Sequence, residues 1–184
     1  KIMNHIKNRR SGVVLHPTAL AGYNGIGDLG PEAYKFIDFL FDTGQSLWQI
    51  LPLGPTDYSN SPYSSLSTFA GNHLLISFES LKSDGLIDEQ YLIDYQSDSN
   101  KVDFEEVKNY KLPKLKIVAK NFKENASKEI LSAFDIFCNK EMYWLYDYSK
   151  YYALKEQNND ENWFNWKTDG IIDLEIVEEA KILQ

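Results

Sequence analysis

The chain has 184 residues, of which 43% are hydrophobic and 25% charged, and this composition is typical of a globular protein rather than of a disordered chain. Its formal net charge of -8 argues against a general nucleic-acid or anionic-membrane surface, because a polyanion would be repelled. One cysteine excludes an internal disulfide and a cysteine-based zinc site.

The chain carries no obvious targeting signal. Its start, KIMNHIKNRRSG, is basic but lacks the apolar run of a signal peptide. Lys, Asp or Asn interrupts every apolar run, so no stretch predicts a membrane span. We therefore expect a cytoplasmic protein with no membrane or nucleic-acid partner, whose oligomeric state the sequence leaves open.

The first elements along the chain predict a strand, a helix and a second strand. Residues 11–17 (SGVVLHP) and 46–51 (SLWQIL) are short apolar runs without alternation, which is typical of strands buried on both faces. Between them, Pro31 stands where a helix favours proline, and Gly44 is placed to end that helix. The helix should bury one apolar face, formed by Ala33, Phe36, Ile37, Leu40 and Phe41.

Short links in this strand–helix–strand unit imply parallel strands and a right-handed crossover. The carboxyl ends of parallel strands share one edge of a sheet, and that edge is where ligands bind in such folds. The loops that follow the two strands, residues 16–30 and 52–65, should therefore lie close together.

The remaining chain predicts mainly helices. Residues 72–78 (NHLLISF) fit a further short strand or extended segment, residues 79–91 a small acidic helix, and residues 94–100 a polar surface loop. Apolar residues recur at helical spacing over 114–125 and 128–157, and a last helix starts at Asp173. Two strands cannot close a barrel, which takes roughly 200 to 250 residues, so the helices either cover a small open sheet or the chain is the beginning of a longer one.

The loop after the second strand is unusually long and carries two tyrosines, Tyr58 and Tyr63. The two rings either pack the loop down or form a platform for a sugar, whose C–H face stacks on an aromatic ring. Asn60 and Ser61 would supply short donors and acceptors for sugar hydroxyls. His16 lies at the end of the first strand. It either makes a polar contact to a ligand or to the loop backbone, or it has a purely structural role. The three histidines are too far apart in sequence to suggest a metal site.

Two acidic residues lie in the loops at this edge. Asp28 is best explained as organising its glycine-rich loop, and Asp57 as capping the turn TDYS. A glycosidase needs two carboxyl groups facing one bond, and no such pair can be nominated. We therefore assign no catalytic residue within these 184 residues.

Residues 25–30 (GIGDLG) match the glycine pattern of dinucleotide-binding folds. The pattern is displaced from its strand by PTALAGYN, and the second strand runs into PLGP rather than ending near an acidic residue. Nucleotide binding is therefore the weaker alternative, and the glycines are better explained by a tight turn.

Several segments together resemble the opening of the 4-α-glucanotransferases, the amylomaltases or disproportionating enzymes of glycoside hydrolase family 77. The segments are RRSGVVLHPTAL, GIGDLGPEAYKFIDFL, GQSLWQILPLGPT and NSPYSSLSTFAGNHLLIS, with a weaker match in WLYDYSKYYALKEQ and WFNW. Asp57 and His73 depart from the glycine and proline that are common in the family at these positions.

The resemblance implies an α/β fold that starts a (β/α)8 barrel over residues 9–86, followed by a mainly helical subdomain over 87–184, with 1–8 as a tail. It implies retaining transfer of α-1,4-glucan segments between malto-oligosaccharides, with two carboxyls about 5–5.5 Å apart and no metal, nucleotide or other cofactor. In the family those carboxyls come from later barrel strands, so we expect the 184-residue chain alone to be inactive.

The resemblance also implies roles for three loop residues. Tyr63 matches the tyrosine that stacks on the sugar next to the scissile bond, Ser61 a neighbouring polar contact, and Tyr58 a tyrosine of a secondary glucan groove in some members. The rival interpretation is a non-catalytic carbohydrate-binding or regulatory module that kept only the start of the fold.

Overall fold

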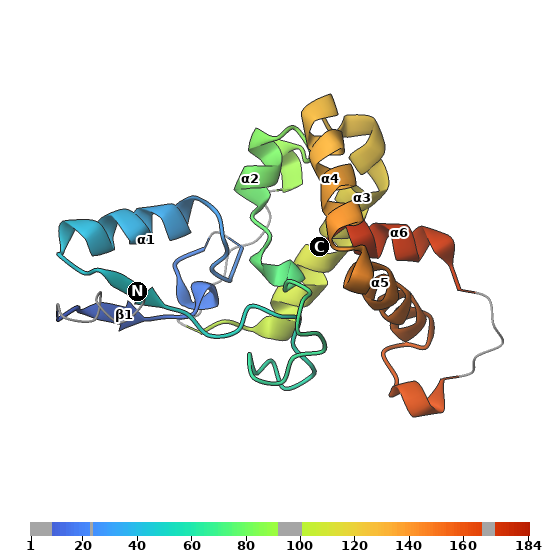
Figure 1. Cartoon of the computed structure of the whole chain (residues 1–184), viewed down its shortest axis with the longest axis horizontal. Helices are drawn as coiled ribbons and strands as arrows, with labels where there is room; N and C mark the ends of the chain where they lie inside the picture. Colours follow the sequence, from blue (N-terminus) through green and yellow to red (C-terminus); the bar gives the residue numbers. More distant parts are fainter. Residues whose placement is uncertain (1–8, 23, 92–100, 167–171) are drawn as a thin grey trace, which may run out of the picture.

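The structure, a computed structural model, describes residues 9–22, 24–91, 101–166 and 172–184. The tail at 1–8 and the surface loop expected at 94–100 lie outside the described residues. Figure 1 shows a helix beside a small sheet at one end of the molecule and a group of helices around the C-terminus at the other.

The predicted strand–helix–strand unit is confirmed. Strands β1 (Gly12–Val14) and β2 (Leu47–Gln49) pair in parallel, with Val13 opposite Trp48, and α1 (Pro31–Asp42) is the crossover helix. Pro31 occupies the first turn of α1, and Gly44, just beyond its end, has the left-handed φ of 73° that favours glycine.

The prediction that both strands are buried on both faces is wrong for this structure. Val13 and Trp48 are half-buried, and the Trp48 ring meets Phe36 of α1 edge-on at 5.0 Å between ring centroids. On the opposite face Val14 is 60% and Leu47 48% exposed. The physical reason is that α1 covers only one face of a two-stranded sheet, so nothing among the described residues packs on the other.

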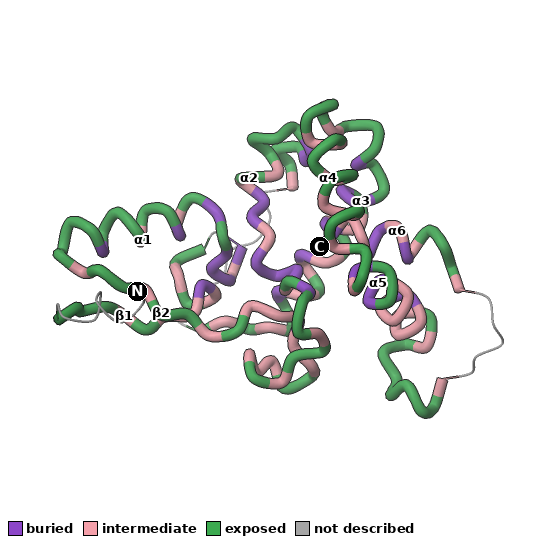
Figure 2. The backbone as a smooth tube through the Cα atoms, viewed as in Figure 1, coloured by how far each residue is buried: buried purple, intermediate pink, exposed green. Residues whose placement is uncertain are grey.

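The predicted apolar face of α1 is likewise only partly buried. Ala33 and Leu40 are buried and Phe36 is half-buried, whereas Ile37 and Phe41 are exposed. Figure 2 shows this end of the molecule as mostly exposed backbone. The spacing therefore identified a helix correctly but overstated how much of its surface is covered.

The segment at 72–78 is not a strand. It forms a 3-10 turn, η3 (His73–Leu75), and then enters α2 (Phe78–Ser83). The Asn72 side chain accepts from the backbone N–H of Leu74, and Ser77 caps α2 in the same way. Such local side-chain acceptors favour turns and helix starts over extended chain.

Four helices make up most of the remaining structure. They are α3 (Phe104–Asn125), α4 (Lys128–Lys140), α5 (Met142–Gln157) and α6 (Leu174–Ile182). The helix expected over 128–157 is divided at Glu141 into α4 and α5, and α6 is capped by Asp173 as expected. Three further 3-10 turns are η2 (Pro17–Ala19), η4 (Glu89–Tyr91) and η5 (Trp163–Asn165). No described helix is long and apolar enough to cross a membrane.

Two apolar clusters join these elements. The larger one packs residues of α2, of the turn after it and of α3 with the chain end: Phe78, Leu86, Ile87, Leu115, Val118, Ala119, Phe122 and Leu183. The smaller one packs Ile26 of the glycine-rich loop, Leu74 of η3 and Val107 of α3. The larger cluster contains residues from both sides of the predicted subdomain boundary at residue 86. The division into subdomains at that residue remains a prediction.

Candidate functional site

The loops after β1 and β2 meet at one edge of the sheet, as parallel pairing requires. The backbone N–H of Leu15 donates to the Gln49 carbonyl at 3.0 Å, and the Trp48 indole donates to the Leu15 carbonyl at 2.8 Å. One residue further on, His16 Nε2 lies 3.3 Å from the Pro52 carbonyl oxygen. The predicted shared edge is confirmed.

A cleft of about 200 Å³ opens at this edge. Its lining comes from the first loop, the long second loop and the start of α3: His16, Thr18, Leu51, Pro52, Gly54, Thr56, Asn60, Pro62, Asn72 and Phe104. Two of the five predicted binding residues, His16 and Asn60, thus line the same cleft. The cleft combines apolar surface with hydroxyl, amide and imidazole groups, which suits a neutral polyol.

The long loop is held in shape by its own backbone. Leu66 N–H donates to the Pro55 carbonyl and Asp57 N–H to the Ser64 carbonyl. Asn72 N–H donates to the Leu53 carbonyl at 2.9 Å and closes the loop at its base. At Gly54 a Cβ atom would lie 2.3 Å from the Ser65 hydroxyl, so the close approach of the two arms requires glycine.

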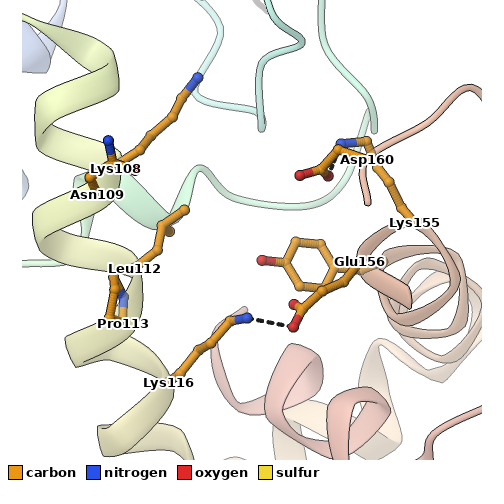
Figure 3. A pocket seen from close by; sticks show the side chains of 9 residues that line it. Lys108, Asn109, Leu112, Pro113, Lys116, Lys155, Glu156 and Asp160 are labelled. Atoms are coloured by element: carbon orange, nitrogen blue, oxygen red, sulfur yellow. Dashed lines mark hydrogen bonds and ion pairs between the residues drawn. The ribbon is translucent and has the colours of Figure 1, made fainter. Parts of the chain in front are cut away.

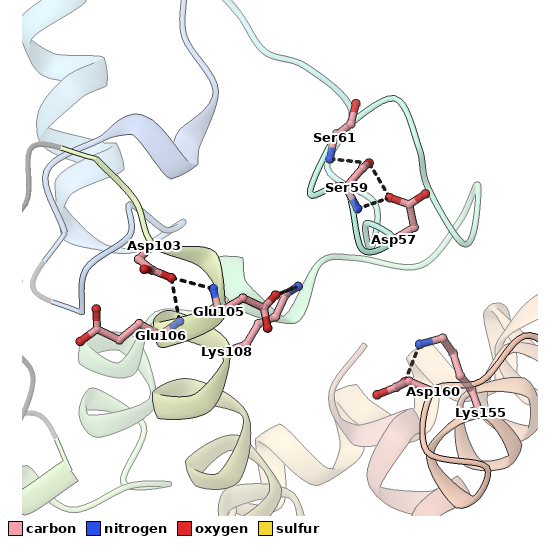
Figure 4. Close-up of polar contacts among 9 residues, drawn as sticks. All are labelled: Asp57, Ser59, Ser61, Asp103, Glu105, Glu106, Lys108, Lys155 and Asp160. Carbon is pink, nitrogen blue, oxygen red and sulfur yellow. Dashed lines mark hydrogen bonds and ion pairs between the residues drawn. The ribbon is translucent and has the colours of Figure 1, made fainter.

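Asp57 organises the tip of the loop, as predicted (Figure 4). Its Oδ1 accepts from the backbone N–H of Ser59 at 2.8 Å and from the Ser59 hydroxyl at 2.5 Å, and its Oδ2 accepts from the Ser64 hydroxyl at 2.5 Å. These hydrogen bonds, with Ser59 first, lower the pKa of the Asp57 carboxyl below its usual value. The carboxylate is therefore committed to loop structure.

The two tyrosines project from this organised loop. Tyr58 is 92% and Tyr63 75% exposed, so neither ring packs the loop down. The Ser61 hydroxyl accepts from the backbone N–H of Tyr63 at 3.3 Å and so constrains the residue that carries the second ring. An exposed ring on a constrained backbone is available for stacking, although its role toward a sugar remains a prediction.

Asn60 and His16 differ in how fully they are already bonded. Asn60 adopts a left-handed φ of 55°, which asparagine tolerates, and no donor among the described residues reaches its shielded side-chain oxygen. His16 is bonded through both ring nitrogens, since Nδ1 lies 2.7 Å from the Thr18 hydroxyl and Nε2 faces the Pro52 carbonyl. The Asn60 side-chain oxygen is thus unbonded but enclosed, whereas His16 already has a structural role.

A second, larger cavity of about 430 Å³ lies between α3 and α5 (Figure 3). Its walls carry three lysines that are paired with carboxylates: Lys116 with Glu156 at 2.5 Å, Lys155 with Asp160, and Lys108 with Glu105 at 3.1 Å. The sequence offered no signal for it, because its residues come from two helices about forty positions apart.

The glycine-rich segment does not have the geometry of a dinucleotide site. A Cβ atom on Gly30, which caps α1, would lie 2.1 Å from the Ser77 hydroxyl and 2.8 Å from Asp28 Oδ1. Asp28 Oδ1 also accepts from Gly30 N–H at 2.9 Å, which confirms that this residue organises its loop. The helix N-terminus is thus filled by the chain's own carboxylate and hydroxyl, and a phosphate would meet a like charge there.

The described residues contain no group of three or more His, Cys, Asp or Glu side chains placed to hold a metal ion.

Phe104 and Asn72 line the cleft but were not among the predicted site residues. Phe104 comes from the start of a helix some forty residues beyond the tyrosines, and only the folding of α3 against the loops brings it there. Sequence spacing carries no information about such a contact.

The fold and the cleft define an α/β protein in which a parallel βαβ unit presents an internally hydrogen-bonded loop with two exposed tyrosines beside a cluster of helices. A family model described as 4-alpha-glucanotransferase matches residues 15–181, and the chain belongs to this family. The resemblance drawn from the sequence motifs is thereby confirmed.

Individual relatives agree with this assignment. The chain is 42% identical to a 4-alpha-glucanotransferase of Synechocystis over 89% of its length and 33% of the relative's, and 42% identical to one of Thermus thermophilus over 86% of its length and 31% of the relative's. An amylomaltase from Streptococcus agalactiae, solved in complex with acarbose, superposes with a TM-score of 0.87 at 32% identity, covering 96% of this chain and 38% of that one. The chain thus spans about a third of the curated relatives it matches.

Proposed function

We propose that the whole protein is a cytoplasmic 4-α-glucanotransferase and that these residues form the amino-terminal wall of its glucan cleft. In this proposal β1, α1 and β2 begin a (β/α)8 barrel, and the helices after residue 86 form a subdomain inserted beside it. The enzyme moves α-1,4-glucan segments between malto-oligosaccharides without a cofactor. The support is family membership together with the exposed, constrained tyrosines at the carboxyl edge of the strands.

The proposed reaction is a retaining double displacement. One carboxylate attacks the anomeric carbon while a carboxylic acid protonates the leaving oxygen, and an acceptor sugar then replaces the enzyme. We place both carboxyls outside these 184 residues, because Asp28 and Asp57 at the strand edge are committed to loop structure.

The described residues contribute donor binding in this proposal. The Tyr63 ring stacks on the C–H face of a glucose unit near the scissile bond, Ser61 and Asn60 bond its hydroxyls, and Tyr58 supports the chain further along. Stacking of this kind is worth roughly 0.5–1.5 kcal/mol beyond area burial. His16 shapes the cleft through its bonds to Thr18 and Pro52.

The experiment is maltotriose disproportionation by the full-length protein, which should yield glucose and longer glucans. Tyr63→Ala should raise KM for maltotriose about tenfold, as expected for about 1.4 kcal/mol, while Tyr63→Phe keeps the stacking surface and most of the affinity. Unchanged kinetics in Tyr63→Ala would show that the ring takes no part in donor binding.

The same assay separates the rival interpretation. A non-catalytic carbohydrate-binding module would bind malto-oligosaccharides without forming longer products, even as the full-length protein. We expect that result only for the 184-residue chain alone. Protection of the chain by NAD or ATP in a thermal shift would instead favour the nucleotide alternative.

A further inference from the structure

Lys111 is a fully buried lysine in α3, with 0% of its surface exposed. Its ammonium donates to the Leu74 carbonyl at 2.8 Å and to the Ile76 carbonyl at 2.7 Å. The Asp28 carboxylate lies 3.8 Å away, at ion-pair distance. Lys111 therefore makes two hydrogen bonds to backbone carbonyls and one ion pair to a carboxylate.

The two carbonyls belong to the segment that leaves the base of the long loop. Between them, the Leu75 carbonyl accepts from Leu29 N–H at 3.0 Å on the side of the glycine-rich loop. Three consecutive carbonyls are thus fixed from two directions, by α3 and by the loop that carries Asp28. Asn72, which closes the long loop on Leu53 and lines the cleft, lies two residues before the first of them.

The same helix reaches the cleft directly. Val107, one turn before Lys111, packs with Ile26 and Leu74, and Phe104, at the start of α3, packs on this cluster and lines the cleft. Lys111 therefore lies behind the cleft wall, where α3 contacts both the glycine-rich loop and the base of the long loop. This long loop, which carries Tyr58 and Tyr63, is called the tyrosine loop below.

We propose that Lys111 is a positioning residue, which holds α3 and the base of the tyrosine loop in the register that forms the glucan cleft. The proposal rests on the proposed function, and Lys111 itself touches neither the cleft nor a sugar. Burying an ammonium is costly, and a core residue that served packing alone would be better apolar. A lysine here gains two directional hydrogen bonds and an ion pair that an apolar side chain cannot make.

The charged groups around Lys111 are consistent with this role. Burial raises the pKa of Asp28 to about 6 and lowers the pKa of Lys111 to about 8, so both groups are charged near neutral pH. Glu79 lies nearby and accepts from the Ser77 hydroxyl at 3.1 Å. Removing Lys111 alone would leave a buried carboxylate uncompensated, so the informative variant also neutralises Asp28.

The test compares Lys111→Met/Asp28→Asn with the control Leu115→Ala in the full-length protein. Leu115 is equally buried in α3 and lies one turn further on, in the larger apolar cluster, and its hydrocarbon side chain has no donor for the loop carbonyls. Both variants should lose stability. Only the double variant should exchange the amides of Asn72 and Leu29 about tenfold faster and raise KM for maltotriose about tenfold with kcat little changed.

Amide exchange and KM that match the Leu115→Ala control would overturn the proposal, because Lys111 would then only stabilise the fold. Wild-type amide exchange and KM in the double variant would also overturn it, since Lys111 would then only balance the charge of Asp28. If the wild-type protein did not act on maltotriose, the proposed function would fail. Amide exchange would still decide whether Lys111 holds residues 72–76 in place.

Discussion

At the scale of single residues, short polar side chains hold the tip of the tyrosine loop in one shape through hydrogen bonds. Asp57 alone accepts three hydrogen bonds from Ser59 and Ser64. Its neighbour Tyr58 projects almost fully into solvent because the turn beneath it is closed by these bonds. The resemblance marks residue 57 as a departure from a common glycine, and the structure shows what the carboxylate does there.

Asp57→Ala should loosen the loop tip and raise KM for maltotriose in the full-length protein, with little change in the unfolding temperature. The reason is that the loop contributes few buried contacts but positions both rings. Asp38→Ala, on the exposed side of α1, makes the same change in net charge and should leave KM unchanged. Equal effects of the two substitutions would mean that net charge, not loop structure, matters.

His73 is the second residue at which this chain departs from the pattern it resembles. Its ring is buried, meets Tyr152 edge-on at 5.3 Å between centroids, and lies 2.8 Å from the Gln184 amide nitrogen through Nε2. Burial lowers the pKa of His73 from 6.5 to about 4. The folded chain therefore holds a neutral imidazole that accepts from the Gln184 amide.

This residue predicts acid sensitivity. Between pH 6.5 and about 4 the unfolded chain binds a proton at His73 that the folded chain does not, so the contribution of His73 to stability falls as the pH is lowered through this window, by up to about 3 kcal/mol. His73→Phe keeps an aromatic ring and removes the titration. Chemical denaturation at several pH values should show the difference between wild type and variant changing across the window, and parallel curves would refute the assignment.

At the scale of elements, α3 connects the cleft to the helical part of the molecule. Its N-cap, Asp103, accepts from the backbone N–H groups of Glu105 and Glu106 at 3.1 and 3.0 Å (Figure 4). The next residue, Phe104, lines the cleft. The cap thus fixes the turn that carries one wall of the proposed site.

Asp103→Ala should cost about 1 kcal/mol of stability and should also weaken maltotriose binding, because the frayed turn carries Phe104. The matched control is Asp173→Ala, which removes the equivalent cap of α6, where Asp173 accepts from Glu175 N–H at 2.9 Å. Asp173→Ala should cost a similar amount of stability without weakening maltotriose binding. Thermal unfolding and KM measured on both variants decide the point, and an equal loss of binding in the control would contradict it.

At the scale of the whole molecule, the two ends differ in how well they are covered. The helices pack around two apolar clusters to which β1, β2 and α1 contribute no residue, and the sheet and α1 expose large apolar side chains, among them Val14, Phe39 and Phe41. The helical end also exposes such side chains, among them Ile136 and Met142. Figure 2 shows the contrast, with buried backbone concentrated toward the middle of the molecule. Apolar surface of this kind favours association.

We expect the 184-residue chain, expressed alone, to self-associate through this end. Val14→Thr/Phe41→Ser should reduce the association because it removes apolar surface from the sheet and from α1. Leu174→Ser removes an exposed leucine from α6 and should leave it unchanged. Sedimentation velocity over a range of concentrations measures the effect, and a monomer at all concentrations would contradict the expectation.

Much of the fold was predictable from local patterns. Pro31 and Gly44 bound α1, Asp173 caps α6, and two short apolar runs pair in parallel around the crossover. The patterns erred where local side-chain bonding or missing cover decided the outcome. Asn72 and Ser77 turn an apolar segment into a 3-10 turn and a helix start, and the strands have cover on one face only.

The site shows the same division. Composition and spacing predicted the edge that the two loops share, because a helical crossover implies parallel strands. They also predicted the structural roles of Asp28 and Asp57, which depend on neighbours a few residues away. Only the tertiary structure decided that Phe104 and Asn72 complete the cleft, that both rings stay exposed and that Lys111 joins three segments behind it. These contacts depend on how α3 packs on the loops, and the helical spacing of apolar residues shows which face of a helix is buried but not what packs against it.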